Sequence, residues 1–243
     1  MKTNLKNKIM LALVFGNMFL CNHVFALVNN ANYWSCSDSS VTTWIGFSNK
    51  DVSGLQTLTG ARASGANLSL NNTSTCIGDS VAIGNVNYFA GGFSYTATVS
   101  GNIVTVSNFT TTDNYAGIVG GCAISSNTIT GNTVNVNSGT FNSNNSGPAI
   151  FGGYNDVGSG DVTYNVVNIN EGTFQNGFII GGGVVKDGSA TNNTVNVNKG
   201  IFQNATILGG YVKDGSGNAQ NNTVNINGGT FKDTIIMGST TSA

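Results

Sequence analysis

Histidine, arginine and proline are nearly absent from this chain, and charges of either sign are few. Its 243 residues include one arginine, Arg62, and one proline, Pro148, and charged side chains account for 8% of the chain. The single histidine, His23, lies within the segment 1–26, which has the pattern of an export signal. The rest of the chain therefore has no imidazole. This excludes histidine-based catalytic triads, histidine-ligated zinc or haem, and histidine acid–base catalysis.

The segment 1–26 is expected to direct export and then to be removed. Lysines at positions 2, 6 and 8 precede an apolar run at 9–20, and Val-Phe-Ala at 24–26 forms a cleavage site before Leu27. The apolar run is shorter than a bilayer-spanning helix requires, so a retained transmembrane helix is the weaker interpretation. Cys21 raises the alternative of a lipid anchor, but Leu20 stands where a lipidation signal needs a small residue.

From Leu27 onward the chain is acidic and rich in asparagine and glycine. This part contains six Lys and Arg against ten Asp and Glu, a net charge of −4. No basic patch is left to bind a phosphate backbone, which argues against a nucleic-acid partner. The abundance of Asn and Gly is known from disordered tracts, but Val, Ile and Phe recur at fixed intervals and can supply a core. Because no apolar stripe has helical spacing, the sequence predicts an all-β protein.

One phrase of eleven residues is repeated along the second half of the chain. NNTVNINGGTF at 221–231 has near copies at 131–141, 164–174 and 192–202. The alternation in TVNVN predicts a half-buried strand with valine on one face and asparagine on the other. Each copy is followed by an apolar step into glycine, usually a glycine pair, as in IIGG at 179–182. The glycines are expected to allow a sharp bend.

The spacing of the copies predicts a solenoid. The copies begin at positions 131, 164, 192 and 221. This spacing is too short for propeller blades, which need about 40 or more residues. Leucine-rich repeats are disfavoured because they would show a helix-forming leucine pattern. We therefore expect a parallel β-helix of about five coils with a period near 29 residues, two or three short strands per coil, and coils about 4.8 Å apart. The expected organisation is a signal at 1–26, a non-repetitive cap at 27–66 and β-helix repeats at 67–243.

Stacking in register should place equivalent side chains of successive coils in columns. The expected interior columns are Val134, Val167, Val195 and Val224, and Phe141, Phe174, Phe202 and Phe231, with Phe109 as an earlier phenylalanine of the second. The expected outward column is an amide ladder of Asn135, Asn168, Asn196 and Asn225. On this interpretation the recurrence of the phrase is architectural and does not mark a repeated catalytic site.

Units of the form NNTVNINGGTF, loops such as GGYVKDGSGNAQ at 209–220 and an N-terminal export signal resemble the repeats of autotransporter passenger domains, which are adhesin-like surface proteins of Gram-negative bacteria. The resemblance covers roughly residues 101–238 and is absent from the segment 27–66. It implies a right-handed β-helix carried to the cell surface by a C-terminal outer-membrane β-barrel. It also implies partners among host or neighbouring-cell surface components or glycans.

The sequence departs from that family in its last residues. The stretch after Phe231, KDTIIMGSTTSA, lacks the alternating ten-residue strands of a barrel. Ile235, Ile236 and Met237 would face the mouth of the last coil, where solenoids normally have a polar cap. Three explanations stay open: a truncated product, an excerpt of a longer protein whose barrel is missing, and a short secreted solenoid that associates end to end.

Three cysteines remain after removal of the leader. In an oxidising compartment we expect a disulfide between Cys36 and Cys76 that ties the non-repetitive segment to the first coils. Cys122 would then be a free buried thiol. The alternative pairing is Cys76–Cys122. A thiol nucleophile needs an activating base, and without histidine structural cysteines are favoured. Trp34 and Trp44 are expected to cover the hydrophobic end of the first coil, with a carbohydrate-stacking site as the alternative.

Acidic residues recur in one loop of successive coils, at Asp156, Asp187 and Asp214. Stacked carboxylates can bind calcium, but Lys186 and Lys213 accompany two of them and the nonapeptide pattern of calcium-binding rolls is missing, so solvated turns without a metal or cofactor are expected. No pair of acids recurs at glycosidase-like placement, so we expect no catalytic residues.

The sequence thus favours an exported, non-enzymatic β-helix of the cell surface or the medium, either the passenger or a passenger fragment of an autotransporter-like adhesin. The alternative is a self-associating structural solenoid. A carbohydrate-active β-helix enzyme is the third hypothesis.

Overall fold

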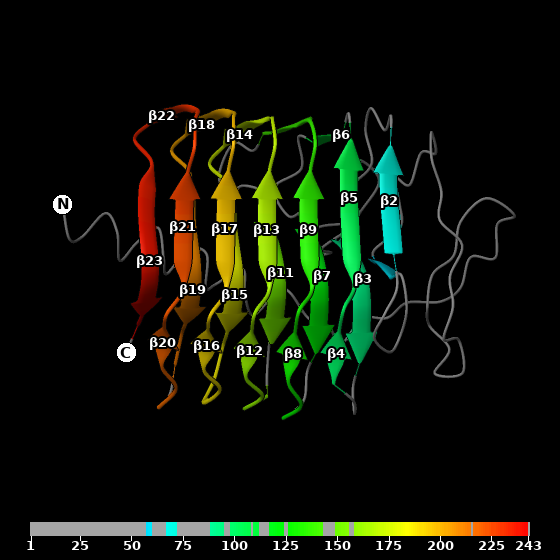
Figure 1. The fold of residues 1–243 in the computed structure, drawn as a ribbon, viewed down its shortest axis with the longest axis vertical. Coiled ribbons are helices and arrows are strands. Elements are labelled where there is room, and N and C mark those ends of the chain that lie inside the picture. The colour runs from blue at the N-terminus through cyan, green and yellow to red at the C-terminus, as the bar shows by residue number, and fades with distance from the viewer. Residues whose placement is uncertain are drawn as a thin grey trace, which may run out of the picture.

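A computed structural model describes residues 57–59, 67–71, 88–94, 98–107, 109–111, 117–123, 126–142, 149–155, 158–214 and 216–242. Every regular element within these residues is a β-strand. Strands of successive coils lie side by side along the stack, from β2 and β3 at one end to β23 at the other (Figure 1).

The described strands form four sheets and pair in parallel. The seven-stranded sheet contains, in spatial order, β1 (Thr57–Thr59), β3 (Tyr88–Ser94), β7 (Gly117–Ala123), β11 (Ala149–Asn155), β15 (Phe178–Val184), β19 (Thr206–Val212) and β23 (Ile235–Thr241). The six-stranded sheet contains β2 (Asn67–Asn71), β5 (Ile103–Ser107), β9 (Thr133–Val136), β13 (Val166–Ile169), β17 (Thr194–Val197) and β21 (Thr223–Ile226).

Two narrower sheets complete each coil. The β4 sheet contains β4 (Val99–Ser100), β8 (Ile129–Thr130), β12 (Val162–Thr163), β16 (Ala190–Thr191) and β20 (Ala219–Gln220). The β6 sheet contains β6 (Phe109–Thr111), β10 (Gly139–Phe141), β14 (Thr173–Gln175), β18 (Ile201–Gln203) and β22 (Thr230–Lys232).

The predicted parallel β-helix is confirmed. Strands β4 to β23 fall into five successive sets of four, each with one strand from every sheet. The expectation of two or three strands per coil was too low, because each coil has four. The short strand before the repeated phrase and the short strand around its phenylalanine both pair with their equivalents in the next coil. The stack also reaches back before residue 67, since β1 pairs with β3. The handedness of the helix stays a prediction.

The repeated phrase stacks in register. In the six-stranded sheet, Val167 pairs with Val134 and Val195, and Val195 pairs with Val224. The column continues backward through Val104 to Leu68. The four valines of the first expected column are therefore aligned, as are the four asparagines that follow them: Asn135, Asn168, Asn196 and Asn225.

The phenylalanine column is aligned from Phe141 to Phe231 but does not include Phe109. In the ladder Phe141 pairs with Thr111, and Phe109 pairs with Gly139. The difference lies in the sequence: Phe109 stands three positions after Val106, whereas Phe141 stands five positions after Val136. The two turns are equally long, since Val106 pairs with Val136 and Phe109 pairs with Gly139. The earlier strand therefore carries its phenylalanine two positions sooner than the later one.

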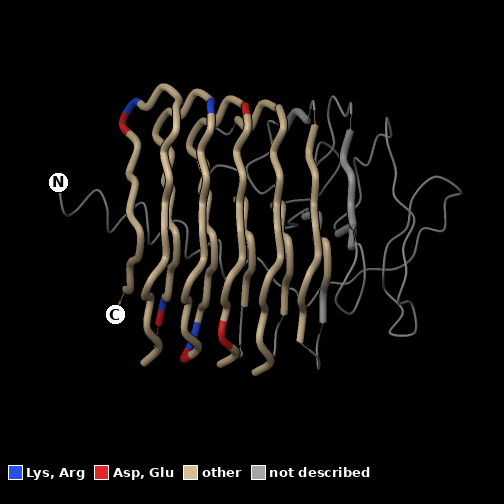
Figure 2. Tube along the Cα trace, in the orientation of Figure 1, with Lys and Arg blue, Asp and Glu red and all other residues tan. Residues whose placement is uncertain are grey.

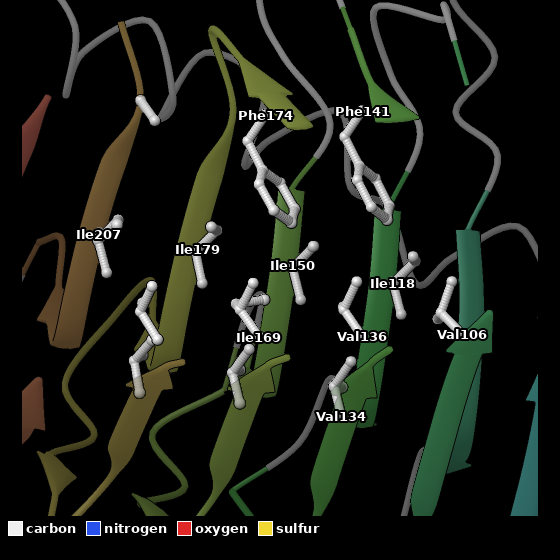
Figure 3. Packing of buried hydrophobic residues seen from close by; sticks show 14 of the residues in the cluster. Val106, Ile118, Val134, Val136, Phe141, Ile150, Ile169, Phe174, Ile179 and Ile207 are labelled. Atoms are coloured by element: carbon white, nitrogen blue, oxygen red, sulfur yellow. The ribbon is translucent and has the colours of Figure 1, made fainter. Parts of the chain in front are cut away.

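The core runs along the axis as columns of aliphatic and aromatic side chains (Figure 3). Isoleucines of the seven-stranded sheet, such as Ile150 and Ile179, face the valines of the six-stranded sheet in one buried cluster. The rings of Phe141, Phe174 and Phe202 close one end of this cluster, stacked at centroid distances of 4.8 and 5.0 Å with planes 4° apart. The ring spacing matches the strand spacing of about 4.8 Å, so each coil adds one ring to the column.

Each coil turns one of its corners with left-handed backbone. Between the β4 sheet and the six-stranded sheet, φ is positive at every copy: Gly101 (68°), Gly131 (64°), Tyr164 (56°), Asn192 (56°) and Asn221 (56°). Glycine and asparagine tolerate this conformation, whereas a tyrosine adopts it at a cost. Tyr164 is also 62% exposed, so little packing offsets that cost.

We expect Tyr164→Asn to stabilise the protein by about 0.5–1 kcal/mol, because asparagine adopts left-handed backbone with less strain than tyrosine. The reciprocal change, Asn192→Tyr, tests the same corner one coil later and should destabilise by a similar amount. Thermal unfolding followed by circular dichroism measures both. A lower melting temperature for Tyr164→Asn would contradict the explanation.

Candidate functional surface

A buried ladder of asparagines forms the corner between the β4 sheet and the six-stranded sheet. Its members are Asn102, Asn132, Asn165, Asn193 and Asn222, of which the first four have no exposed surface. The side-chain amide of each of the first four donates to the side-chain oxygen of the asparagine in the next coil, at 2.7 to 3.1 Å. That oxygen also accepts the backbone N–H of the preceding ladder member, at 2.9 to 3.1 Å.

The buried ladder also satisfies backbone carbonyls of the β4 sheet. The amides of Asn132, Asn165 and Asn193 donate to the carbonyls of Val99, Ile129 and Val162, each one coil earlier. Buried amides are stable when they are hydrogen-bonded in this way. Sequence reasoning missed this ladder, although one signal was present: asparagine stands two positions before the valine of the first expected column in all four copies of the phrase and also before Val104, while the residue between them varies.

The second glycine of each glycine pair lies against a ladder amide. A Cβ atom on Gly121, Gly153 or Gly182 would lie 2.4 to 2.6 Å from the nearest atom of the opposing asparagine side chain. A Cβ on the first glycine, such as Gly181, would meet a backbone carbonyl of the next coil at 2.4 Å. The first glycine of each pair therefore lets the backbone of the next coil come close, and the second lets the asparagine side chain come close.

The expected outward amide ladder is present on the six-stranded sheet. Asn168, Asn196 and Asn225 each donate to the side-chain oxygen of the asparagine one coil earlier, at 2.8 Å. A second outward ladder lies two positions further along and was not predicted. It contains Asn137, Asn170, Asn198 and Asn227, joined at 2.8 to 2.9 Å. This face of the protein thus carries two parallel rows of amides at the coil spacing.

A shallow groove of about 700 Å³ runs along the stack next to these rows. It is lined by residues 138–140, 171–173, 199–201 and 229–230. Thr140, Thr173 and Thr230 occupy one register position, which Ile201 fills in the intervening coil. Ile201 is 54% exposed. The groove therefore offers spaced hydroxyl groups and one exposed apolar side chain.

Charges of the described residues are confined to the edges of the stack (Figure 2). At the rim of the groove, the Lys199 ammonium lies 2.8 Å from a carboxylate oxygen of Glu171. In the loops after the seven-stranded sheet, the Lys213 ammonium lies 3.6 Å from a carboxylate oxygen of Asp214. The Lys199–Glu171 pair is exposed on both sides, and a pair of this kind contributes little to stability, so the two charges mainly neutralise each other locally. The broad sheet faces between the edges carry amides and hydroxyls.

The loop carboxylates do not form the column that their repeated sequence suggests. The KDGS sequence begins at Lys186 and again at Lys213, a spacing of 27 residues. The ladder pairs Val184 with Val212, a spacing of 28 residues, so equivalent residues of the two loops are out of register by one position. The Asp214 N–H donates to the carbonyl of Val185 at 3.1 Å, so Asp214 stacks on Lys186.

Of the other two loop carboxylates, the structure describes one. Asp187 accepts the Ser216 N–H at 3.3 Å, and Asp156 lies outside the described residues. Within the described ranges, no three His, Cys, Asp or Glu side chains gather into a group that could hold a metal ion.

The described residues include no helix long and apolar enough to cross a membrane. Burial raises the pKa of the Tyr211 phenol well above its usual range.

Cys122 is disulfide-bonded, so the expectation of a free thiol there was wrong. Its partner is not among the residues that the structure describes. Cys36 and Cys76, the pair favoured from the sequence, both lie outside them, as do Trp34 and Trp44. The other cysteines of the chain are Cys21, Cys36 and Cys76.

No match is found for this chain among protein family models, curated proteins or solved structures. The arguments about its function therefore depend on the repeats and on the surfaces described above.

Proposed function

We propose that this protein is an exported, non-enzymatic β-helix that binds surfaces, as the passenger or a passenger fragment of an autotransporter-like adhesin. The observation that carries the proposal is the stacking of identical outward groups. Two amide ladders repeat the same hydrogen-bonding groups about 4.8 Å apart, and the adjacent groove adds threonine hydroxyls in three of its four coils. Weak contacts repeated along a rigid rod add to a useful avidity when the partner is itself repetitive.

The partners that suit such a surface are glycans or other repetitive components of host or neighbouring-cell surfaces. Amides and hydroxyls can donate and accept hydrogen bonds with sugar hydroxyls, and the groove crosses four successive coils. The paired charges at its rim favour a ligand without a strong net charge. Export is supported by the leader pattern and by the disulfide at Cys122, since disulfides persist in oxidising compartments.

Beads coated with the exported protein, checked by N-terminal sequencing to begin at Leu27, should adhere to epithelial cells or glycan-coated surfaces more than beads coated with albumin. A double variant that charges the groove, Ile201→Asp with Thr230→Asp, should lose most of this adhesion through the desolvation of carboxylates at the contact. A matched variant on the β4 sheet, Thr191→Asp with Gln220→Asp, should keep it. Adhesion equal to albumin beads would reject the proposal, and equal loss in both variants would remove the groove from it.

A self-associating structural solenoid is the second candidate, favoured by the last described coil. Ile226 and Ile236 are 41% and 39% exposed, whereas Val197 and Ile207, their partners in the preceding coil, are fully buried. Strands β20 to β23 each have a described neighbour on one side only. An open coil end of this kind can add strands from another molecule. Rods whose length grows with protein concentration, without adhesion to cells, would favour this candidate over the adhesin.

A further inference from the structure

The outer face of the seven-stranded sheet is apolar, although no described strand covers it. Ile118, Ile150, Ile179 and Ile207 of this sheet point into the core. Their successors along the chain, Val119, Phe151, Ile180 and Leu208, pair with one another in register and take the opposite face, as alternation in a strand requires. These four side chains are only 2 to 6% exposed.

A second outward column extends this apolar surface. Cys122, Tyr154 and Tyr211 belong to one register column, with Gly183 between the two tyrosines, and all three side chains are buried. The rings of Phe151 and Tyr154 are in contact, with centroids 4.6 Å apart. Together the two columns, which we call the outer face, span the four coils from β7 to β19.

We propose that residues 27–56 pack along the outer face and are fastened to it by a disulfide between Cys36 and Cys122. Three observations support this assignment. The first is that Cys122 lies within the outer face and is disulfide-bonded. The cysteines elsewhere in the chain are Cys21, Cys36 and Cys76, all of them N-terminal to the outer face.

The second observation is continuity. Residues 27–56 lead directly into β1, and β1 belongs to the same seven-stranded sheet, separated from β7 by β3 alone. The segment therefore starts from one end of the sheet that it would cover. A segment of this length can extend to roughly 100 Å, while four coils at about 4.8 Å spacing occupy less than about 20 Å along the stack. The segment is long enough to cross the outer face and fold back.

The third observation is composition, which favours Cys36 over Cys76. A cover for an aromatic and aliphatic surface must itself be apolar. Both tryptophans of the chain, Trp34 and Trp44, lie close to Cys36 in the sequence, together with Tyr33 and Phe47. The stretch just before Cys76, NNTST, is polar. A disulfide at Cys36 and an apolar cover for the outer face would therefore come from the same segment.

Peptide mapping of the native, non-reduced protein decides the disulfide. After denaturation without reduction, cleavage after Lys and Arg and before Asp places the three cysteines in separate peptides, 27–37, 63–78 and 113–155. We expect mass spectrometry to find 27–37 linked to 113–155. A link between 63–78 and 113–155, or an unlinked 113–155 peptide, would overturn the proposal.

Tryptophan fluorescence tests the packing independently, because both tryptophans lie in the proposed segment. The oxidised protein should emit at the short wavelength of buried indole. Cys36→Ser should shift this emission toward that of the denatured chain and leave the far-ultraviolet circular dichroism of the β-helix unchanged, whereas Cys76→Ser should change neither.

A variant of the outer face gives a second measurement that does not depend on the disulfide. Ile180→Asp should shift the tryptophan emission as Cys36→Ser does, while Thr191→Asp on the β4 sheet should not. If the oxidised wild-type protein already shows the emission of exposed tryptophan, or if Ile180→Asp leaves it at short wavelength in a folded protein, the segment does not pack on this face.

Discussion

Replacing Asn193 by alanine is expected to lower the free energy of unfolding by about 3–5 kcal/mol, among the largest effects of any single change on the described surface or core. The side chain of Asn193 has no exposed surface and takes part in four hydrogen bonds that the substitution removes. The backbone N–H of Asn165 and the carbonyl of Val162 would lose these partners inside the protein. A buried polar group without a partner costs roughly 1–3 kcal/mol.

The matched control is Asn196→Ala, three positions further along the same coil. Asn196 also stands in an amide ladder, donating to Asn168 and accepting from Asn225 at 2.8 Å. Its ladder faces outward, so water can replace both hydrogen bonds, and we expect a loss of only about 0.5–1.5 kcal/mol. Chemical denaturation of the two variants measures the difference. Equal losses would mean that burial does not distinguish the two ladders.

The contrast between the two ladders shows what the sequence could predict. Alternation of valine and asparagine in TVNVN determines which residues face inward and which face outward, so the columns of Val134 and Asn135 followed from the pattern. The same logic assigns every asparagine to the outside. Asn165 and Asn193 are inside because each buried amide finds its partners in the neighbouring coils, and these partners become visible only after the coils are stacked.

Register was predictable where strands are regular and not where loops intervene. The strand phrases align from coil to coil because each pairs along its whole length. Phe109 and Asp214 were misplaced for a different reason: each lies one or two positions away from the ladder position that its place in the repeated sequence suggests, and this offset shows only once the strands are paired. The disulfide at Cys122 was mispredicted because the number of cysteines is odd after the leader, and the sequence alone does not determine which of them is unpaired.

The second large effect concerns the glycine opposite the buried ladder. Gly182→Ala is expected to destabilise the protein by about 2–3 kcal/mol or more, because added atoms in a packed interior force their neighbours to move. A Cβ at this position would lie 2.4 Å from Cγ and Nδ2 of Asn193. That amide cannot retreat without breaking its bonds to Val162 and Asn222, at 2.8 and 3.0 Å.

A double-mutant cycle identifies the opposing atom. If the Cβ of Gly182→Ala collides with Asn193, the double variant Gly182→Ala with Asn193→Ala should cost less than the sum of the single changes, by roughly 1–3 kcal/mol of coupling. Gly182→Ala combined with Asn196→Ala should be additive within about 0.5 kcal/mol, since Asn196 lies on the outward face. Additivity in the first pair would show that the glycine is required by its own backbone. Coupling in that pair alone would establish that the glycine and the buried asparagine form one unit, repeated in every coil and maintained together.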